Sequence, residues 1–128
     1  MIGYAMLGTN DLARARGFYD PLFETVGIKP LMEFPKGPAY GLSWDKPMLA
    51  IGIPYDDAPA TVGNGSMVAL AMAERAQVDA LHARALELGG TCEGPPGVRG
   101  EEGPQAFYGA YFRDLDGNKL CAYRVGPA

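Results

Sequence analysis

The chain has 128 residues, 48% of them hydrophobic and 20% charged, which is enough for one compact domain with a substantial core. Its formal net charge of −4 at pH 7 argues against a nucleic-acid-binding protein, because such proteins hold phosphates with clustered Lys and Arg. The apolar runs fall far short of the roughly 20 residues needed to span a bilayer, so no interaction with a membrane is expected.

The first half begins with a short apolar run at residues 2–8, which predicts a strand. Thr9, Asn10 and Asp11 then supply side-chain oxygens that can cap a helix. Pro21 predicts a kink or an early stop near Asp20, because proline lacks an amide hydrogen and presses on the preceding turn. The apolar face of this helix has residues three and four apart, up to the terminating Gly27: Leu12, Ala15, Phe18, Tyr19, Leu22, Phe23 and Val26.

Three strands are predicted next, separated by the turn sequences PKG and DK, at Lys29–Phe34, 38–44 and 47–54. The second half restarts with a strand at 66–73 and a helix that ends at Gly89 and Gly90. The apolar stripe of this helix is Val78, Leu81, Ala85 and Leu88. Short strands follow at 91–93, 105–113 and 118–125, the last two joined by an Asp116-Gly117 turn.

The two halves therefore share the order strand, helix, three strands. Met67 follows Tyr4 by 63 residues, and the helix-ending Gly90 follows Gly27 by the same 63. This spacing predicts a duplicated βαβββ module, although few letters match between the halves. We expect module one at about 1–54, a linker at 55–65 and module two at about 66–128, within a single domain.

Two connections are rich in Gly and Pro. Residues 55–65 join the halves and are predicted to be a surface linker. Residues 94–103 interrupt the second half beside an aromatic strand. They fit an idle surface loop and, nearly as well, a mobile flap over a pocket.

Three segments carry a resemblance to a known family: LGTNDLARARGFYDPLF, GNGSMVALAMAERAQVDALHARALELGG and FYGAYFRDLDGNKL. Together they resemble the vicinal oxygen chelate superfamily, also called the glyoxalase, bleomycin-resistance and extradiol dioxygenase group. The resemblance implies an α+β fold, in which two βαβββ modules form an open, barrel-like, curved mixed sheet with the helices outside. It also implies a homodimer, in which a second chain covers exposed edge strands.

Family enzymes usually hold a divalent metal with His, Glu and sometimes Gln side chains from the first and last strands of each module. By resemblance, these ligand positions fall on Tyr4, on Met67, on Cys121 and on the strand at 48–53, which has no His, Asp, Glu or Gln. A phenol with a pKa near ~10, a thioether and a single thiol are poor ligands for hard cations. We therefore expect no metal and no other cofactor.

Cys121 is either a nucleophile or a small, inert thiol that lines a pocket. A nucleophile needs a nearby base or cation to lower its pKa, and Lys119 on the same strand face would raise the local positive potential. The single His, His82, is expected on the outer surface of the second helix, paired with Asp79, and away from the sheet. These considerations favour the inert thiol.

Aromatic and Met side chains supply the remaining pocket candidates. Tyr108 and Tyr111 point to opposite faces of their strand, and by resemblance Tyr111 faces the concave side with Gly109 and Arg113. The turn residues Asp114 and Asp116 are expected to be structural, because such carboxylates bond nearby amides. Five further side chains line the pocket or fill the core: Met6, Met32, Tyr40, Trp44 and Met48.

Two functional hypotheses follow. In the first, the chain has lost the usual metal ligands and binds a small organic molecule in the concave pocket. In the second, it is a lyase, isomerase or dioxygenase-related enzyme that uses Tyr4, Tyr111 and Cys121 in place of a metal. With two cysteines and no basic start followed by an apolar signal region, a cytoplasmic location with reduced thiols is expected.

Overall fold

The computed structural model describes residues 1–128 and contains two helices and eight strands. Module one consists of β1 (Tyr4–Gly8), α1 (Leu12–Glu24), β2 (Lys29–Phe34), β3 (Gly37–Gly41) and β4 (Met48–Gly52). Module two consists of β5 (Val68–Ala71), α2 (Arg75–Glu87), β6 (Thr91–Arg99), β7 (Phe107–Arg113) and β8 (Lys119–Val125). The predicted duplication is confirmed, and neither helix is long and apolar enough to cross a membrane.

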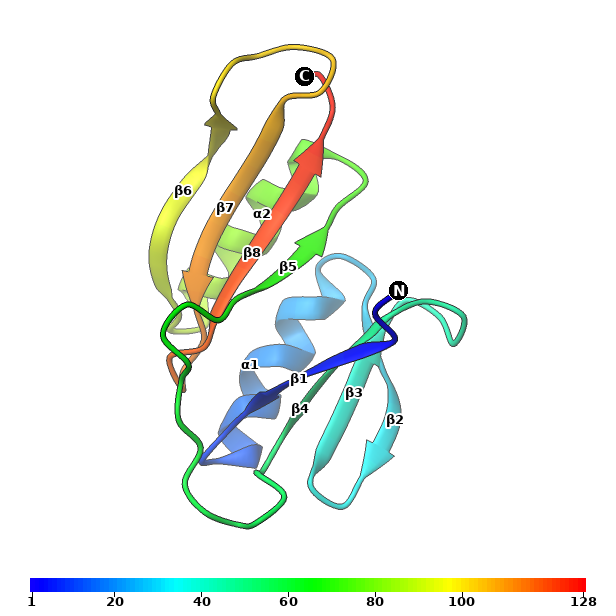
Figure 1. Ribbon diagram of the computed structural model, residues 1–128, viewed down its shortest axis with the longest axis vertical. Helices are drawn as coiled ribbons and strands as arrows, with labels where there is room; N and C mark the ends of the chain where they lie inside the picture. Colours follow the sequence, from blue (N-terminus) through cyan, green and yellow to red (C-terminus); the bar gives the residue numbers. More distant parts are fainter.

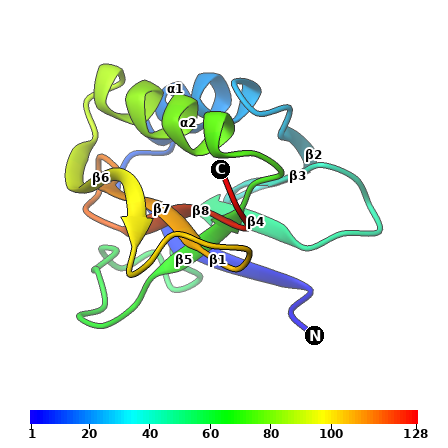
Figure 2. The same cartoon turned by 90° about the horizontal axis from the view of Figure 1, so that it is seen from above.

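The eight strands form two separate mixed sheets of identical topology. Sheet one has the order β1-β4-β3-β2 and sheet two the order β5-β8-β7-β6. In each sheet the first strand of the module pairs in parallel with the last, and the other pairs are antiparallel. The sheets lie side by side without closing into a barrel (Figure 1), and both helices cover the same side of them (Figure 2). The opposite side of each sheet is called its helix-free face below.

Helix α1 packs its apolar stripe into the core. Asp11 caps its first turn by accepting a hydrogen bond from the Arg14 amide at 3.0 Å. The helix continues through Pro21 to Glu24, so the predicted early stop is wrong. A proline inside a helix costs about 3 kcal/mol, but fully burying Leu22 and Phe23 contributes roughly 1.5–3 kcal/mol for each side chain.

The predicted strands are all present and in the predicted order, but most of them begin or end at other residues than predicted. The largest difference is β6, which runs from Thr91 to Arg99 and thus includes residues predicted to lie in a loop. It pairs with β7 through two register shifts, at Cys92/Gly94 and at Gly94/Gly97. Such bulges accommodate the glycines and prolines that obscure the strand in the sequence. The flap hypothesis for 94–103 is therefore wrong for 94–99, and only residues 100–103 lie outside the strand.

Helix α2 begins with a capping box formed by Glu74 and Gln77. Its stripe residues Val78, Leu81 and Ala85 are fully buried, and they join α1 in one core of 15 buried residues shared by both modules. His82 is also buried, at 5% exposure, and its Nε2 has no hydrogen-bond partner. Its expected surface position is wrong. Burial lowers the pKa of His82, which favours the neutral ring.

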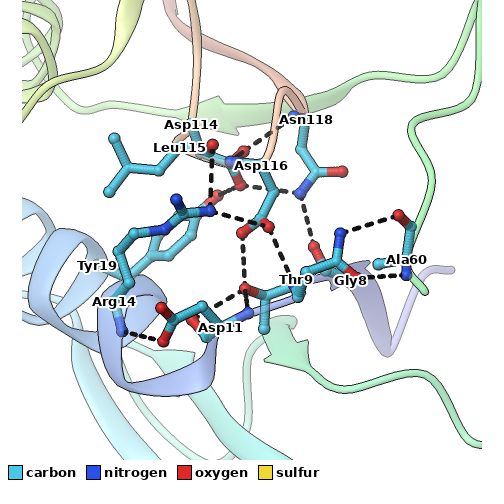
Figure 3. A network of polar contacts seen from close by, with 11 residues as sticks. Gly8, Thr9, Asp11, Arg14, Tyr19, Ala60, Asp114, Leu115, Asp116 and Asn118 are labelled. Atoms are coloured by element: carbon cyan, nitrogen blue, oxygen red, sulfur yellow. Dashed lines mark hydrogen bonds and ion pairs between the residues drawn. The ribbon is translucent and has the colours of Figure 1, made fainter. Parts of the chain in front are cut away.

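A network of polar side chains joins the two modules at the β7–β8 turn (Figure 3). Asp114 accepts hydrogen bonds from the Tyr19 hydroxyl at 2.6 Å, from the Asn118 amide and side chain, and from the Asp116 amide. Asp116 in turn accepts from the Thr9 hydroxyl at 2.6 Å. Both carboxylates thus hold α1 and β1 against module two, which confirms the structural role predicted for them.

Candidate ligand-binding site

A cavity of about 410 Å³ opens on the helix-free face of sheet one and is called the sheet-one cavity here. Ten of its 13 lining residues are hydrophobic. The lining comes from all four strands, the β2–β3 turn and the start of the linker: Tyr4, Met6, Met32, Phe34, Lys36, Gly37, Ala39, Met48, Ala50, Ile51, Gly52, Ile53 and Tyr55. Such a concave apolar surface is suited to a small organic ligand.

Strand alternation explains which side chains reach this cavity. On β1, Ala5 and Leu7 pack against the core, so Tyr4 and Met6 point to the opposite face. On β4, Ala50 lies opposite Met6 and lines the same cavity. The small side chain of Ala50 leaves room in this part of the cavity lining.

The polar groups of the sheet-one cavity are few. Tyr4 is 72% exposed, and its side chain therefore stands at the open side of the cavity rather than in the core. The Lys36 ammonium binds the Asp57 carboxylate at 2.5 Å and donates to the Pro54 carbonyl at 3.3 Å. Because these contacts occupy Lys36, the cavity offers mainly apolar contact with the Tyr4 phenol at its edge.

The helix-free face of sheet two brings Tyr111 and Cys121 together. These residues are directly opposite each other across β7 and β8. Tyr108 points the other way and donates to Asp79 at 2.6 Å, which confirms the predicted opposite faces. Asp79 lies near His82 but forms no hydrogen bond with it. Burial, and then the neighbouring Cys121, raise the pKa of Tyr111.

Cys121 is almost fully buried, at 1% exposure. Burial raises the pKa of its thiol, and this exceeds the opposing effects of Tyr111, Arg99 and Lys119. A raised pKa leaves less thiolate at neutral pH, and the thiolate is the nucleophile. The environment of Cys121 therefore favours the inert thiol over the nucleophile.

The two remaining sequence candidates lie elsewhere. Arg113 donates from Nε to Glu93 at 2.7 Å and from Nη1 to the Gly117 carbonyl at 3.0 Å, so its guanidinium is held at the end of β7. Met67 precedes β5 and lines a second cavity, of about 560 Å³, between the two modules. Within one chain, Tyr4 and Met67 thus line different cavities, and neither cavity includes Tyr111, Arg113 or Cys121.

The other aromatic and Met candidates divide between cavity, core and surface. Of the two predicted alternatives, pocket lining and core, the structure shows pocket lining for three Met side chains: Met6, Met32 and Met48 line the sheet-one cavity. Tyr40 is buried in the core beneath α1, and Trp44 is 66% exposed at the β3–β4 turn. Sequence reasoning missed Phe34, Ala50 and Ile53 in the cavity, although period-two alternation along the strands contained this signal.

The residues at the family's ligand positions do not fit a divalent metal. Tyr4, Met67 and Cys121 offer a phenol, a thioether and a buried thiol, and β4 offers only apolar side chains and glycine. No group of three or more His, Cys, Asp or Glu side chains converges anywhere in the chain. Hard cations require several oxygen or imidazole ligands, which this donor set does not provide.

The two free thiols are expected to differ strongly in reactivity, because Cys92 is exposed and Cys121 is buried with a raised pKa. With an aromatic disulfide reagent at pH 7.5, we expect one thiol per chain to react at least about tenfold faster than the second. Cys92→Ser removes the fast phase, and Cys121→Ser preserves it. Fast reaction of the Cys92→Ser variant would show that Cys121 is accessible and activated.

Comparison with known proteins gives a consistent result. The model of the Glyoxalase/Bleomycin resistance protein/Dioxygenase superfamily matches residues 1–122. The crystal structure of a glyoxalase/bleomycin resistance protein from Albidiferax ferrireducens T118 is 40% identical, with a TM-score of 0.85 over 97% of this chain and 98% of that chain. No curated protein matches.

More distant solved structures share the fold alone. Hypothetical protein SA1046 from S. aureus is 22% identical, with a TM-score of 0.69 over 97% of this chain and 92% of that chain. Lactoylglutathione lyase from Agrobacterium tumefaciens is also 22% identical, with a TM-score of 0.65 over 97% of this chain and 92% of that chain.

Proposed function

Since the chain belongs to the glyoxalase/bleomycin resistance protein/dioxygenase superfamily, we propose that it binds a small organic molecule in the sheet-one cavity without the family's usual metal. The observation that carries this proposal is the apolar lining of the cavity, with ten hydrophobic residues among 13. Burial of apolar ligand surface contributes roughly 25 cal/mol per Å², so this cavity favours a largely apolar molecule. The ligand binds by shape and apolar contact, and the Tyr4 hydroxyl offers a hydrogen bond at the edge.

Binding without covalent chemistry is supported by the groups that surround the sheet faces. The raised pKa of Cys121 disfavours nucleophilic attack. His82 lies on α2, which covers the opposite side of sheet two from Tyr111 and Cys121, so it is no base for this thiol. No observation specifically favours the lyase, isomerase or dioxygenase alternative, and family membership by itself does not define a reaction.

We further propose that the protein is a homodimer in which a second copy covers exposed apolar side chains of sheet one and leaves the helix-free face of sheet two open. Large apolar side chains are exposed on sheet one, including Tyr4 at 72%, Met6 at 49% and Phe34 at 51%. Covering them removes apolar surface from water. Light scattering coupled to size-exclusion chromatography is expected to give twice the chain mass of 13.6 kDa. A mass of one chain at all concentrations up to about 100 µM would contradict the dimer.

Filling the sheet-one cavity is expected to weaken ligand binding strongly. Small apolar molecules are first screened for an increase in melting temperature, since a ligand that binds the native state stabilises it. Ala50→Trp places a large ring in the cavity and is expected to weaken binding of a hit at least about tenfold. Ala13→Trp is the matched control, because Ala13 is exposed on α1 and far from the cavity lining.

Calorimetric titration of both variants provides the measurement, and circular dichroism verifies that each is folded. Equal affinity of a hit for the Ala50→Trp and Ala13→Trp variants would exclude the sheet-one cavity as the binding site. Stoichiometric divalent metal in protein purified without chelator, detected by elemental analysis, would exclude the metal-free part of the proposal.

A further inference from the structure

Two cations without a carboxylate partner meet at one aromatic ring on sheet two. Six of the eleven Lys and Arg side chains are in ion pairs with Asp or Glu. Arg99 and Lys119 are not among these six. The Arg99 guanidinium carbon lies 5.5 Å from the centroid of the Tyr111 ring, and the Lys119 ammonium lies 5.6 Å from it. Such a convergence of free cations is notable in a chain with a net charge of −4.

The backbone of β6 holds Arg99 in this position. Its guanidinium donates to the Pro95 carbonyl at 2.6 Å and to the Gly97 carbonyl at 3.0 Å. A Cβ atom at Gly94 would lie 3.2 Å from one terminal nitrogen of Arg99, and one at Gly97 would lie 3.2 Å from the other. The two glycines, and the bulge between them, thus leave room for the guanidinium to fold back over the sheet.

The surroundings of the two cations remain positive. Glu93 is the carboxylate that faces this group, and its pKa is lowered first by its hydrogen bond with Arg113 and also by the charge of Lys119. Arg113 binds Glu93 at 2.7 Å. Three cations and one carboxylate leave a net charge of +2 in this part of the surface. Arg99 is exposed and Lys119 and Tyr111 are half-buried, so a ligand can reach them.

We propose that Arg99 and Lys119, held over the ring of Tyr111, form a binding site for the carboxylate group of a small organic acid. Guanidinium and ammonium groups provide charge-assisted hydrogen bonds to carboxylate oxygens. The Tyr111 ring holds both cations over its face by cation–π contact, at similar distances from its centroid, so that one carboxylate can meet both. Because two hydrogen bonds already fix Arg99, little side-chain entropy is lost when the carboxylate binds.

This site does not rest on the function proposed above, because its three residues lie on β6, β7 and β8 and none lines the sheet-one cavity. Its ligand differs as well, since the sheet-one cavity is almost wholly apolar. The Ala50→Trp experiment therefore tests the sheet-one cavity, and the benzoate titration below tests the Arg99–Lys119 site, and either proposal can fail without the other.

The test is a titration of the ¹⁵N-labelled native protein with sodium benzoate, followed by ¹H–¹⁵N correlation NMR at constant ionic strength. Benzoate is expected to shift the amide signals of Arg99, Tyr111 and Lys119. Benzamide, its neutral counterpart, is expected to bind at least about tenfold more weakly, since it lacks the charge that both cations recognise. Arg99→Gln and Lys119→Gln are each expected to weaken benzoate binding about five- to tenfold.

Lys29→Gln is the matched control, because Lys29 is an exposed cation on β2 without an ion pair, and it should leave benzoate binding unchanged. All three variants change exposed or half-buried side chains, and their melting temperatures verify that they are folded. Equal affinity for benzoate and benzamide would overturn the site, as would benzoate binding that both Gln variants leave intact. Sodium sulfate that binds as tightly as benzoate at the same amides would show an adventitious ion only and would also overturn it.

Discussion

Asp114→Ala is expected to lower the free energy of unfolding by about 3–4 kcal/mol, since it removes a buried carboxylate that accepts four hydrogen bonds. Hydrogen bonds to a charged group contribute about 1.5–3 kcal/mol each and are not additive within one network. The Tyr19 hydroxyl, on a side chain that is 1% exposed, would be left without its acceptor. Burial raises the pKa of Tyr19 well above its ordinary value, so the phenol remains a donor.

Urea unfolding monitored by circular dichroism measures this loss. Asp56→Ala is the control, because Asp56 is exposed in the linker and accepts only from the Ala58 amide, and a change within about 0.5 kcal/mol is expected. Tyr19→Phe removes only one of the four hydrogen bonds to Asp114, and a smaller loss, of about 1–2 kcal/mol, is expected. A loss below 1 kcal/mol for Asp114→Ala, on the scale of a single neutral hydrogen bond, would mean that the network does not join the modules.

Gly37→Ala is expected to destabilise the protein by about 3 kcal/mol or more, because both space and backbone conformation require glycine. Gly37 begins β3 with a φ of +150°, which side chains rarely adopt. A Cβ atom there would collide with the Ile51 carbonyl oxygen and lie 2.9 Å from the Gly52 Cα. These neighbours are backbone atoms of β4, which cannot move without breaking sheet one.

Gly17→Ala provides the control of opposite sign. Gly17 is in the middle of α1, and a Cβ atom there would have nothing within 4 Å. Replacing a helical Gly by Ala reduces the entropy of the unfolded chain and is expected to stabilise by about 0.5–1 kcal/mol. Thermal and urea unfolding of both variants give the comparison. A neutral Gly37→Ala variant would show that β3 and β4 lie further apart than described here.

Elements with a local pattern could be predicted well from the sequence. The apolar spacing of both helices, the β2 strand and the Asp116-Gly117 turn depend on residues within a few positions of each other. The matched order of the two modules follows from these elements. Even the role of Asp114 was predictable, because a carboxylate in such a turn bonds the amides that follow it.

Pro21, His82 and the strand at 94–99 show why other features were not predictable. Pro21 is tolerated because Leu22 and Phe23 are buried by distant segments. His82 is buried because α2 presses on sheet two, a contact that no local spacing reveals. Residues 94–99 form a strand because β7 provides hydrogen-bond partners, and this outweighs the local preference of Gly and Pro for loops.

The candidate sites divide in the same way. The sequence alone determined that Tyr4, Met67 and Cys121 are poor ligands for hard metal cations, because the donor atom of a side chain is a property of the residue type. Only the tertiary structure decided that Tyr4 stands at an apolar cavity while Cys121 lies buried beside Tyr111. The positions of side chains depend on how separate strands pair and which face the helices cover, and such contacts between distant residues are fixed only in the folded chain.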